Sequence, residues 1–121
     1  MELQPIIKWA GGKRWLVRKS SELFPAEFNK YIEPFLGGGA VYFHLQPKKA
    51  ILSDVNPELI NVYSAVQKNW KRVVEILKEH QALHCKEYYY IVRGQSPKTI
   101  YARAARTLYL NRTCWNGLYR V

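Results

Sequence analysis

Residues 31–41 constrain the fold most strongly, because they read Tyr-Ile-Glu-Pro-Phe-Leu-Gly-Gly-Gly-Ala-Val. Tyr31 and Ile32 favour a β-strand. Pro34 lacks the N–H that a sheet ladder needs, so we expect the strand to end near Glu33. The glycines permit backbone angles that other residues disfavour, and an apolar helical pattern follows them. Such a strand, loop and helix N-terminus can form a pocket whose backbone donors point at a ligand. A glycine turn without a ligand is the competing interpretation.

A second apolar run covers Ala50 to Ser53 and is consistent with a second buried parallel strand. It ends at Asp54, and an acidic residue at this place in a nucleotide-binding unit commonly accepts hydrogen bonds from ribose hydroxyls. Asn56 already suits the N-cap of a helix whose first residue is Pro57. Asp54 is therefore left without an evident capping role, although a turn aspartate is the alternative.

The N-terminal region contains a second glycine turn, followed by a predicted helix over residues 14–24. Lys13 stands at the start of that helix, where a positive charge opposes the helix dipole. This unfavourable position suggests a ligand role, with a solvated surface lysine as the alternative. Trp9 is either a core aromatic residue or a flat wall for the ring of a ligand.

The second half of the sequence predicts helices. An amphipathic pattern runs from Pro57 to Leu77, as one long helix or as two with a break at Asn69, which could cap the second. Ser96, followed by a proline, predicts the start of another helix that covers about residues 98–110.

Cysteine and histidine residues do not form a metal-binding pattern. His80 and His84 are four residues apart and Cys85 follows them, but no second pair of ligands is present, so we expect no metal. The two cysteines and the absence of a secretory signal fit a reducing cytoplasm. No apolar run approaches the roughly 18 residues of a membrane span, so we expect none.

Basic residues exceed acidic ones in this chain of 121 residues, which has a formal net charge of +10. Residues 91–121 hold no acidic residue and six basic ones, Arg93, Lys98, Arg103, Arg106, Arg112 and Arg120. This balance favours a polyanionic partner, with nucleic acid as the first candidate and phosphate contacts expected at this end. A generally basic protein without such a partner is the alternative.

Four stretches occur together in one order: Lys8-Trp9-Ala10-Gly11-Gly12-Lys13, Glu33-Pro34-Phe35-Leu36-Gly37-Gly38-Gly39, Leu52-Ser53-Asp54-Val55-Asn56 and Asn111-Arg112-Thr113-Cys114-Trp115-Asn116-Gly117-Leu118-Tyr119-Arg120. The set resembles the Dam-type DNA adenine-N6 methyltransferases of bacteria and phages, over nearly the whole chain. The resemblance implies an α/β, Rossmann-like S-adenosylmethionine-dependent methyltransferase fold, incomplete here. Residues 1–56 would belong to the cofactor-binding catalytic domain. Residues 57–121 would be the truncated start of a helical target-recognition region that binds DNA.

The resemblance also implies site residues. S-adenosylmethionine would be the cofactor, with the glycines under its methionine part and Asp54 on its ribose. The implied cofactor contacts are Trp9, Lys13, Glu33, Phe35, Gly37, Gly38, Gly39, Asp54 and Val55. Double-stranded DNA would be the partner, contacted by Arg112, Trp115, Asn116, Leu118 and Arg120.

One departure from the family concerns catalysis. The family transfers the methyl group with an Asp-Pro-Pro-Tyr-type motif, whereas the only aspartate here is Asp54. We therefore expect no catalytic residue in this chain, which we interpret as the N-terminal part of an adenine-specific methyltransferase: a fragment, a truncated gene product or half of a split enzyme.

Three other functions compete with this one. The alternatives are a non-catalytic DNA-binding module and an inactive remnant. A nicotinamide-dependent oxidoreductase fits less well, because Tyr42 occupies the last glycine position of its fingerprint when the count starts at Gly37. Only two core strands are evident, so we also expect an open sheet edge that is prone to association, and marginal stability.

Overall fold

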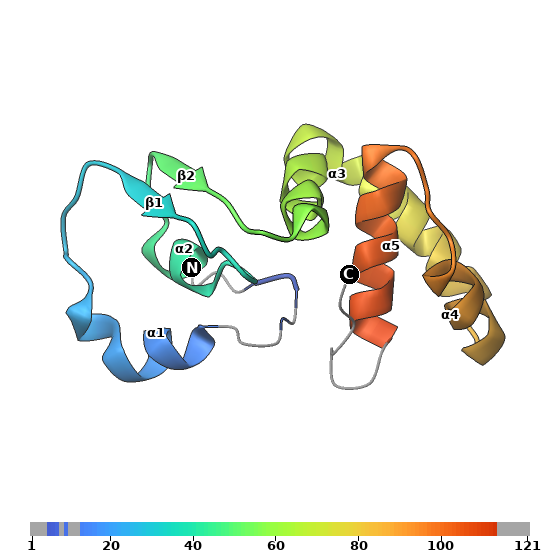
Figure 1. Cartoon of the computed structure of the whole chain (residues 1–121), viewed down its shortest axis with the longest axis horizontal. Coiled ribbons are helices and arrows are strands. Elements are labelled where there is room, and N and C mark those ends of the chain that lie inside the picture. The colour runs from blue at the N-terminus through green and yellow to red at the C-terminus, as the bar shows by residue number, and fades with distance from the viewer. Residues whose placement is uncertain (1–4, 8, 10–12, 114–121) are drawn as a thin grey trace. The chain divides into compact units, whose positions relative to one another are not determined.

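The computed structural model describes residues 5–7, 9 and 13–113. The chain divides into two compact units, Met1–Val55 and Asn56–Val121. The first combines short helices with a small sheet, and the second is helical (Figure 1).

The sheet of the first unit consists of two parallel strands, β1 (Tyr31–Glu33) and β2 (Ala50–Leu52). Tyr31 lies opposite Ala50, and Glu33 lies opposite Leu52. The backbone N–H of Ser53 still donates to the carbonyl of Glu33 at 2.8 Å, although the strand itself ends one residue before the predicted end. Both predicted strands and their parallel pairing are thus confirmed. The prediction that the strands are buried is wrong, because no residue of β1 or β2 is buried and Ile51 is half exposed.

Helices flank this sheet. α1 covers Arg14–Ser20 and continues as a 3-10 turn, η1 (Ser21–Leu23), so the predicted helix is confirmed with a tighter last turn. α2 (Ala40–Leu45) connects β1 to β2 and directs Ala40 and Val41 inward. The buried hydrophobic residues of this unit that the structure describes are Ile7, Leu36, Ala40 and Val41.

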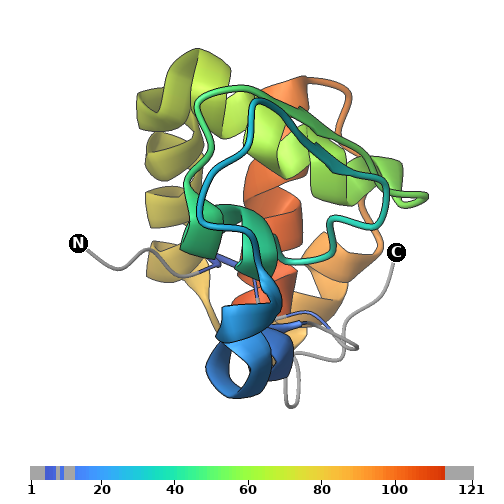
Figure 2. The ribbon, with the colours of Figure 1, turned by 90° about the vertical axis from the view of Figure 1, so that its left-hand side faces the viewer.

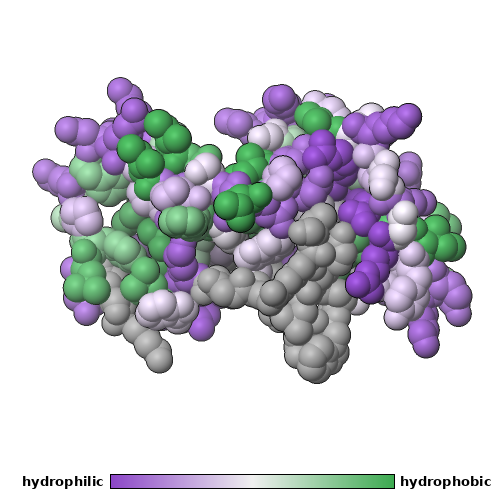
Figure 3. All heavy atoms as spheres, viewed as in Figure 1, coloured by the Kyte–Doolittle hydropathy of each residue, from purple (hydrophilic) through white to green (hydrophobic). Residues whose placement is uncertain are grey.

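One face of the sheet is uncovered in the first unit. Ile32 and Ile51 are register partners, so their side chains lie on the same face. They are 63% and 51% exposed. Figure 3 shows hydrophobic side chains at the surface of this unit.

The longest helix of the second unit, α3 (Pro57–Leu83), begins as predicted. The side chain of Asn56 accepts a hydrogen bond from the N–H of Glu58 at 3.0 Å, and Pro57 occupies the first turn. The predicted break is also confirmed, because Asn69 has non-helical angles (φ −160°, ψ 78°). Its side-chain oxygen accepts from the N–H of Arg72 at 3.2 Å and so caps the second segment. The two segments run in different directions (Figure 2).

Two further helices, α4 (Lys86–Arg93) and α5 (Ile100–Thr113), complete the second unit. The prediction that Ser96 caps the last helix is wrong. The hydroxyl of Thr99 accepts from the N–H of Ala102 at 3.1 Å, so the helix starts later, at Ile100. Cys85 caps α4, because its sulfur accepts from the N–H of Tyr88 at 3.4 Å.

Hydrophobic packing between α3 and α5 forms the core of the second unit. Its fully buried hydrophobic residues among those described are Leu59, Val62, Ala65, Val73, Val92, Ala104, Ala105 and Leu110. The side chain of Asn61 on α3 donates to the carbonyl of Ile100 on α5 at 3.0 Å, which fixes the start of α5 against α3.

The described part of the chain has neither a membrane-spanning helix nor a cluster of metal ligands. No helix there has both the length and the apolar character needed to cross a membrane. No group of three or more His, Cys, Asp or Glu side chains among those residues could hold a metal ion.

Candidate functional site

Residues 35–39, between β1 and α2, form the glycine loop, which is hydrogen-bonded to the residues that follow β2. The N–H of Leu36 donates to the carbonyl of Ser53 at 3.0 Å. The N–H of Gly37 donates to the side-chain oxygen Oδ2 of Asp54, also at 3.0 Å. The carboxyl ends of parallel strands are where ligands bind in open α/β sheets. These contacts therefore define the candidate site within the first unit.

Asp54 has a structural role that the sequence did not reveal. The sequence indicates no capping role for it and leaves a turn aspartate as the alternative, whereas its carboxylate holds a loop that lies 17 residues earlier in the sequence. Turn contacts within a few residues can be predicted from sequence, but this bond depends on the pairing of two strands. A ribose-binding role for Asp54 is therefore an additional function and not the only reason for an acidic residue here.

The glycines are required by the backbone of the loop. Gly37 and Gly39 have positive φ angles of 56° and 82°, in the left-handed region that favours glycine. A Cβ atom on Gly38 would lie 3.0 Å from the backbone carbonyl of Ile7, which is too close without a shift of the main chain.

The expectation that the donors of this loop point at a ligand is wrong for two of them. The N–H of Gly37 bonds to Asp54, and the N–H of Gly39 donates to the carbonyl of Leu36 at 2.9 Å. The loop is a tight turn that satisfies these donors internally. Its glycines instead allow close approach of other groups to the main chain.

Trp9 lies against this loop. A Cβ atom built on Gly37 would be 3.9 Å from Cδ1 of the Trp9 ring, and one on Gly38 would be 3.8 Å from its Cβ. The half-buried indole therefore borders the glycines. This arrangement suits the predicted flat wall beside the loop.

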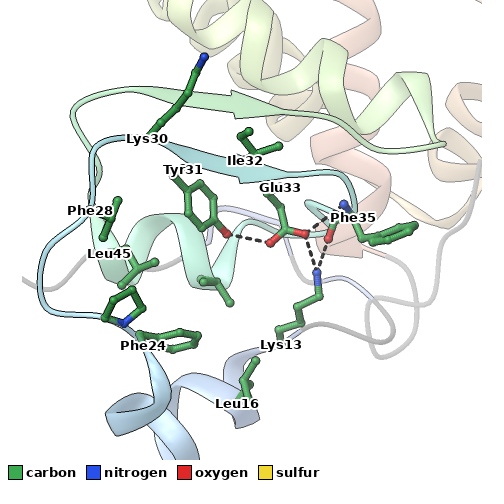
Figure 4. Close-up of a pocket in the computed structure, with 12 residues that line it drawn as sticks. Lys13, Leu16, Phe24, Phe28, Lys30, Tyr31, Ile32, Glu33, Phe35 and Leu45 are labelled. Carbon is green, nitrogen blue, oxygen red and sulfur yellow. Dashed lines mark hydrogen bonds and ion pairs between the residues drawn. The ribbon is translucent and has the colours of Figure 1, made fainter.

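Lys13 is not a freely solvated lysine. Its ammonium group lies 3.1 Å from Oε1 of Glu33 and also donates to the backbone carbonyl of Phe35. The N–H of Phe35 donates to the same Glu33 oxygen at 3.0 Å. A lysine before α1, a glutamate at the end of β1 and the first part of the loop are thus joined in one cluster (Figure 4).

Hydrogen bonding keeps Glu33 ionised. Burial raises the pKa of its carboxyl group, but hydrogen bonds from Tyr31, Lys13 and the Phe35 backbone outweigh burial, and the pKa falls below its ordinary value. The partner hydroxyl responds in the opposite direction, since burial and the adjacent carboxylate raise the pKa of Tyr31.

An open groove of about 540 Å³ extends from this cluster. Its lining is mostly apolar, with Lys13 and Glu33 as a polar pair (Figure 4). The other lining residues are Leu16, Phe24, Pro25, Phe28, Lys30, Tyr31, Ile32, Phe35, Val41 and Leu45.

Most of the predicted cofactor residues therefore form two groups of contacting residues, while two of them have exposed side chains. One group joins Trp9, the glycines and Asp54, and the other joins Lys13, Glu33 and the backbone of Phe35. The side chains of Phe35 and Val55 are 66% and 91% exposed, so packing within the protein does not fix them.

Tyr31 is a functional candidate that sequence reasoning missed. We interpreted it only as a strand residue, but its hydroxyl donates to Oε2 of Glu33 at 2.7 Å. The signal was the spacing of two residues within a strand, which puts both side chains on one face.

The predicted DNA-binding residues are only partly within the described residues. Arg112 lies in the last turn of α5 and is exposed. Trp115, Asn116, Leu118 and Arg120 lie outside the described residues.

Two of the basic residues expected to contact phosphates serve the fold instead. Nε of Arg103 donates to Glu58 at 3.1 Å. Arg106 donates to the carbonyls of Val92 and Arg93 at 3.0 and 2.7 Å, which secures the end of α4 against α5. The positive charge of the C-terminal region is therefore partly used within the second unit.

Known proteins of one family are similar to this chain over nearly its whole length. Residues 9–121 match the family described as D12 class N6 adenine-specific DNA methyltransferase. The Type II methyltransferase M1.LlaDCHI of Lactococcus lactis subsp. cremoris is 43% identical over 100% of this chain and 45% of its own length. M.MjaIII of Methanocaldococcus jannaschii is 41% identical over 100% of this chain and 49% of its own length. The DNA adenine methylase of Haemophilus influenzae is 38% identical over 97% of this chain and 43% of its own length. The chain thus spans about half the length of these relatives.

Proposed function

The chain belongs to the D12 class of N6 adenine-specific DNA methyltransferases, and on this premise we propose that its first unit binds S-adenosylmethionine and that its second unit contributes to binding of double-stranded DNA. The enzyme to which it contributes would transfer a methyl group to N6 of adenine. The observation that carries the proposal is the glycine loop between two parallel strands, held at Gly37 by Asp54.

The proposed architecture is a Rossmann-like methyltransferase fold. Two adjacent parallel strands, connected through α2, are the repeating unit of such folds. The glycine loop lies between the first strand and the helix, which is the usual place of a nucleotide-binding loop.

The residues present fit S-adenosylmethionine. Gly37 and Gly39 have positive φ angles that other residues rarely adopt, and because glycine has no side chain the loop allows close approach of the methionine part. The Trp9 indole would provide a flat surface, and the Asp54 carboxylate would accept from ribose hydroxyls as well as from Gly37. When bound, the cofactor supplies a methyl group on a positively charged sulfur.

Calorimetric titration with S-adenosylmethionine tests this proposal. We expect heat of binding for the wild-type chain, and no heat at cofactor concentrations up to about 1 mM, a weak affinity for any specific ligand, would contradict it. Asp54→Asn separates two roles of that residue, because the amide oxygen can still accept from Gly37 while one acceptor for the ribose is lost. Weaker binding supports a ribose contact, and unchanged binding limits Asp54 to holding the loop.

A methylation assay tests the catalytic part. The chain contains no Asp-Pro-Pro sequence, and its only aspartate bonds to the glycine loop. That motif would stack the extruded adenine and accept from its amino group. We therefore expect cofactor binding without transfer of a labelled methyl group to duplex DNA, and turnover by the purified chain would contradict this expectation.

The second candidate function is DNA binding without a methyl donor. The excess of basic residues in residues 91–121 favours it. Both functions predict salt-dependent DNA binding, but only the methyltransferase function predicts binding of S-adenosylmethionine, so the calorimetric experiment distinguishes them.

A further inference from the structure

Glu33 accepts hydrogen bonds from three different parts of the first unit. Lys13 donates from the residue before α1, the backbone N–H of Phe35 donates from the start of the glycine loop, and the Tyr31 hydroxyl donates from β1. The Glu33 side chain is only 15% exposed. A single carboxylate therefore sets the relative positions of these three groups (Figure 4).

The two oxygens of this carboxylate have different partners. Oε1 accepts from Lys13 and from the Phe35 N–H, at 3.1 and 3.0 Å. Oε2 accepts from the Tyr31 hydroxyl at 2.7 Å. The terminal torsion of a glutamate is broad and weakly restrained. A donor on Oε2 therefore fixes the plane of the carboxylate and keeps Oε1 directed at its two partners.

The position of Phe35 in turn determines where the glycine loop begins. Lys13 donates to the Phe35 carbonyl while Glu33 accepts from the Phe35 N–H, so both polar groups of this peptide residue are bound. Two residues later the loop is fixed again by the bond from Gly37 to Asp54. The loop is thus attached at its start by the Glu33 cluster and in its middle by Asp54.

We infer that Tyr31 is a positioning residue of the methyl-donor site, because its hydroxyl orients Glu33, which holds Lys13 and the first residue of the glycine loop. The inference rests on the proposed function. It adds a residue that lies outside the four stretches that carry the family resemblance. Tyr31 acts through Glu33 and need not touch the cofactor.

The charge balance gives this role a distinct signature. Burial raises the Glu33 pKa, and the Tyr31 hydrogen bond is the largest effect that lowers it. Removal of the hydroxyl should raise the Glu33 pKa. As the pH is lowered, cofactor binding by the variant should therefore be lost at a higher pH than binding by the wild type. Removal of a hydroxyl that only fills space would not change the pH at which binding is lost.

The test compares Tyr31→Phe with Tyr42→Phe. Tyr42 is on α2 with its ring 6.3 Å from that of Tyr31, and within the described part of the chain its hydroxyl makes no hydrogen bond. Titration with S-adenosylmethionine at pH 7 should show about threefold or greater weakening for Tyr31→Phe, as expected for loss of a charge-assisted hydrogen bond. The Tyr42→Phe affinity should stay within about twofold of the wild-type value. Equal affinities and equal pH profiles for the wild type and Tyr31→Phe would overturn the inference.

A second measurement does not depend on the cofactor. Carbon-13 NMR of the Glu33 carboxyl group should show its pKa rising by about half a pH unit or more in Tyr31→Phe, and no change in Tyr42→Phe. An unchanged pKa in Tyr31→Phe overturns the inference even if the wild type binds the cofactor. If the Glu33 pKa rises in Tyr31→Phe but the wild type does not bind S-adenosylmethionine, the proposed function is rejected, and with it the role of Tyr31 in a methyl-donor site. The orientation of Glu33 by Tyr31 would still be supported.

Discussion

The carboxylate of Asp54 accepts a hydrogen bond from the backbone N–H of Gly37 at 3.0 Å. Asp54 follows β2 closely and Gly37 belongs to the loop after β1, so the contact joins the ends of two neighbouring parallel strands. The shape of the glycine loop therefore depends on a side chain outside it. This dependence explains why a change in either segment should affect the same site.

Alanine at Gly39 should destabilise the first unit. Gly39 has a φ of 82°, where a Cβ atom costs about 1–2 kcal/mol. Gly94 is the matched control because its φ is −81° and a Cβ atom there would meet its neighbours at 3.7 Å. Gly94→Ala should be neutral or stabilising by up to about 1 kcal/mol. Chemical denaturation of both variants measures the difference, and equal effects would contradict the assigned loop conformation.

Valine at Thr107 should stabilise the second unit. The hydroxyl of Thr107 is fully buried and has no hydrogen-bond partner among the described residues. Its replacement by a methyl group should increase the free energy of unfolding by about 1 kcal/mol, since a buried unpaired polar group is removed. Thr113→Val is the control, because that hydroxyl donates to the Tyr109 carbonyl at 2.7 Å. Greater stability of Thr113→Val than of Thr107→Val would show that the assignment is wrong.

Stability should fall in acid partly because of Glu33. Its folded-state pKa lies below the ordinary value of 4.5, so the unfolded chain binds the proton more tightly. The contribution of Glu33 is therefore complete above about pH 4.5 and is lost as the pH falls through the folded-state pKa. Denaturation curves between pH 6 and about pH 3 should show a shallower acid loss for Glu33→Gln than for the wild type. Parallel curves would contradict this prediction.

Arg112 should contribute one phosphate contact to DNA binding. In fluorescence anisotropy with a DNA duplex, Arg112→Ala should weaken binding for all sequences and reduce the slope against log salt concentration by about 0.9. Lys78→Ala, an exposed change on α3 that removes the same charge, controls for net charge. If both variants reduce the slope against log salt concentration by the same amount, the effect comes from overall charge and not from a contact at the end of α5.

The uncovered face of the sheet should promote association. Ile32 and Ile51 are exposed neighbours on two strands that together form only a two-stranded sheet in the described part of the chain. We expect concentration-dependent sedimentation at about 10–100 μM, the range in which such surfaces associate, and less of it after threonine replaces both isoleucines. Val55→Thr is the control, because Val55 is 91% exposed but lies outside the strands. Sedimentation of the wild type as a monomer throughout would contradict the expectation.

Local features of the sequence predicted the fold well. Asn56 and Asn69 were recognised as caps because an asparagine before a helical pattern supplies an oxygen to nearby N–H groups, and both bonds are present. The prediction of Ser96 as the cap was wrong, because Thr99, three residues later, can also cap a helix and does so here. The local sequence does not show which hydroxyl meets the first free N–H.

The candidate site was predicted less completely, because its contacts join distant positions. The glycines and Asp54 were identified separately, but their bond follows from the register of β1 and β2. The same reason explains why Lys13 was not paired with Glu33, which lies 20 residues later. The roles of Trp115, Asn116, Leu118 and Arg120 stay predictions.

The short range of these contacts has a consequence for folding. The hydrogen bonds that build the candidate site connect residues at most 22 positions apart, from Lys13 to Phe35, and all of them lie before Asn56, where the second unit begins. Closing such short loops costs little chain entropy, and contacts of low sequence separation form early. During synthesis, the residues of this site leave the ribosome before the helical unit does. Its hydrogen bonds can therefore assemble while the rest of the chain is still being made.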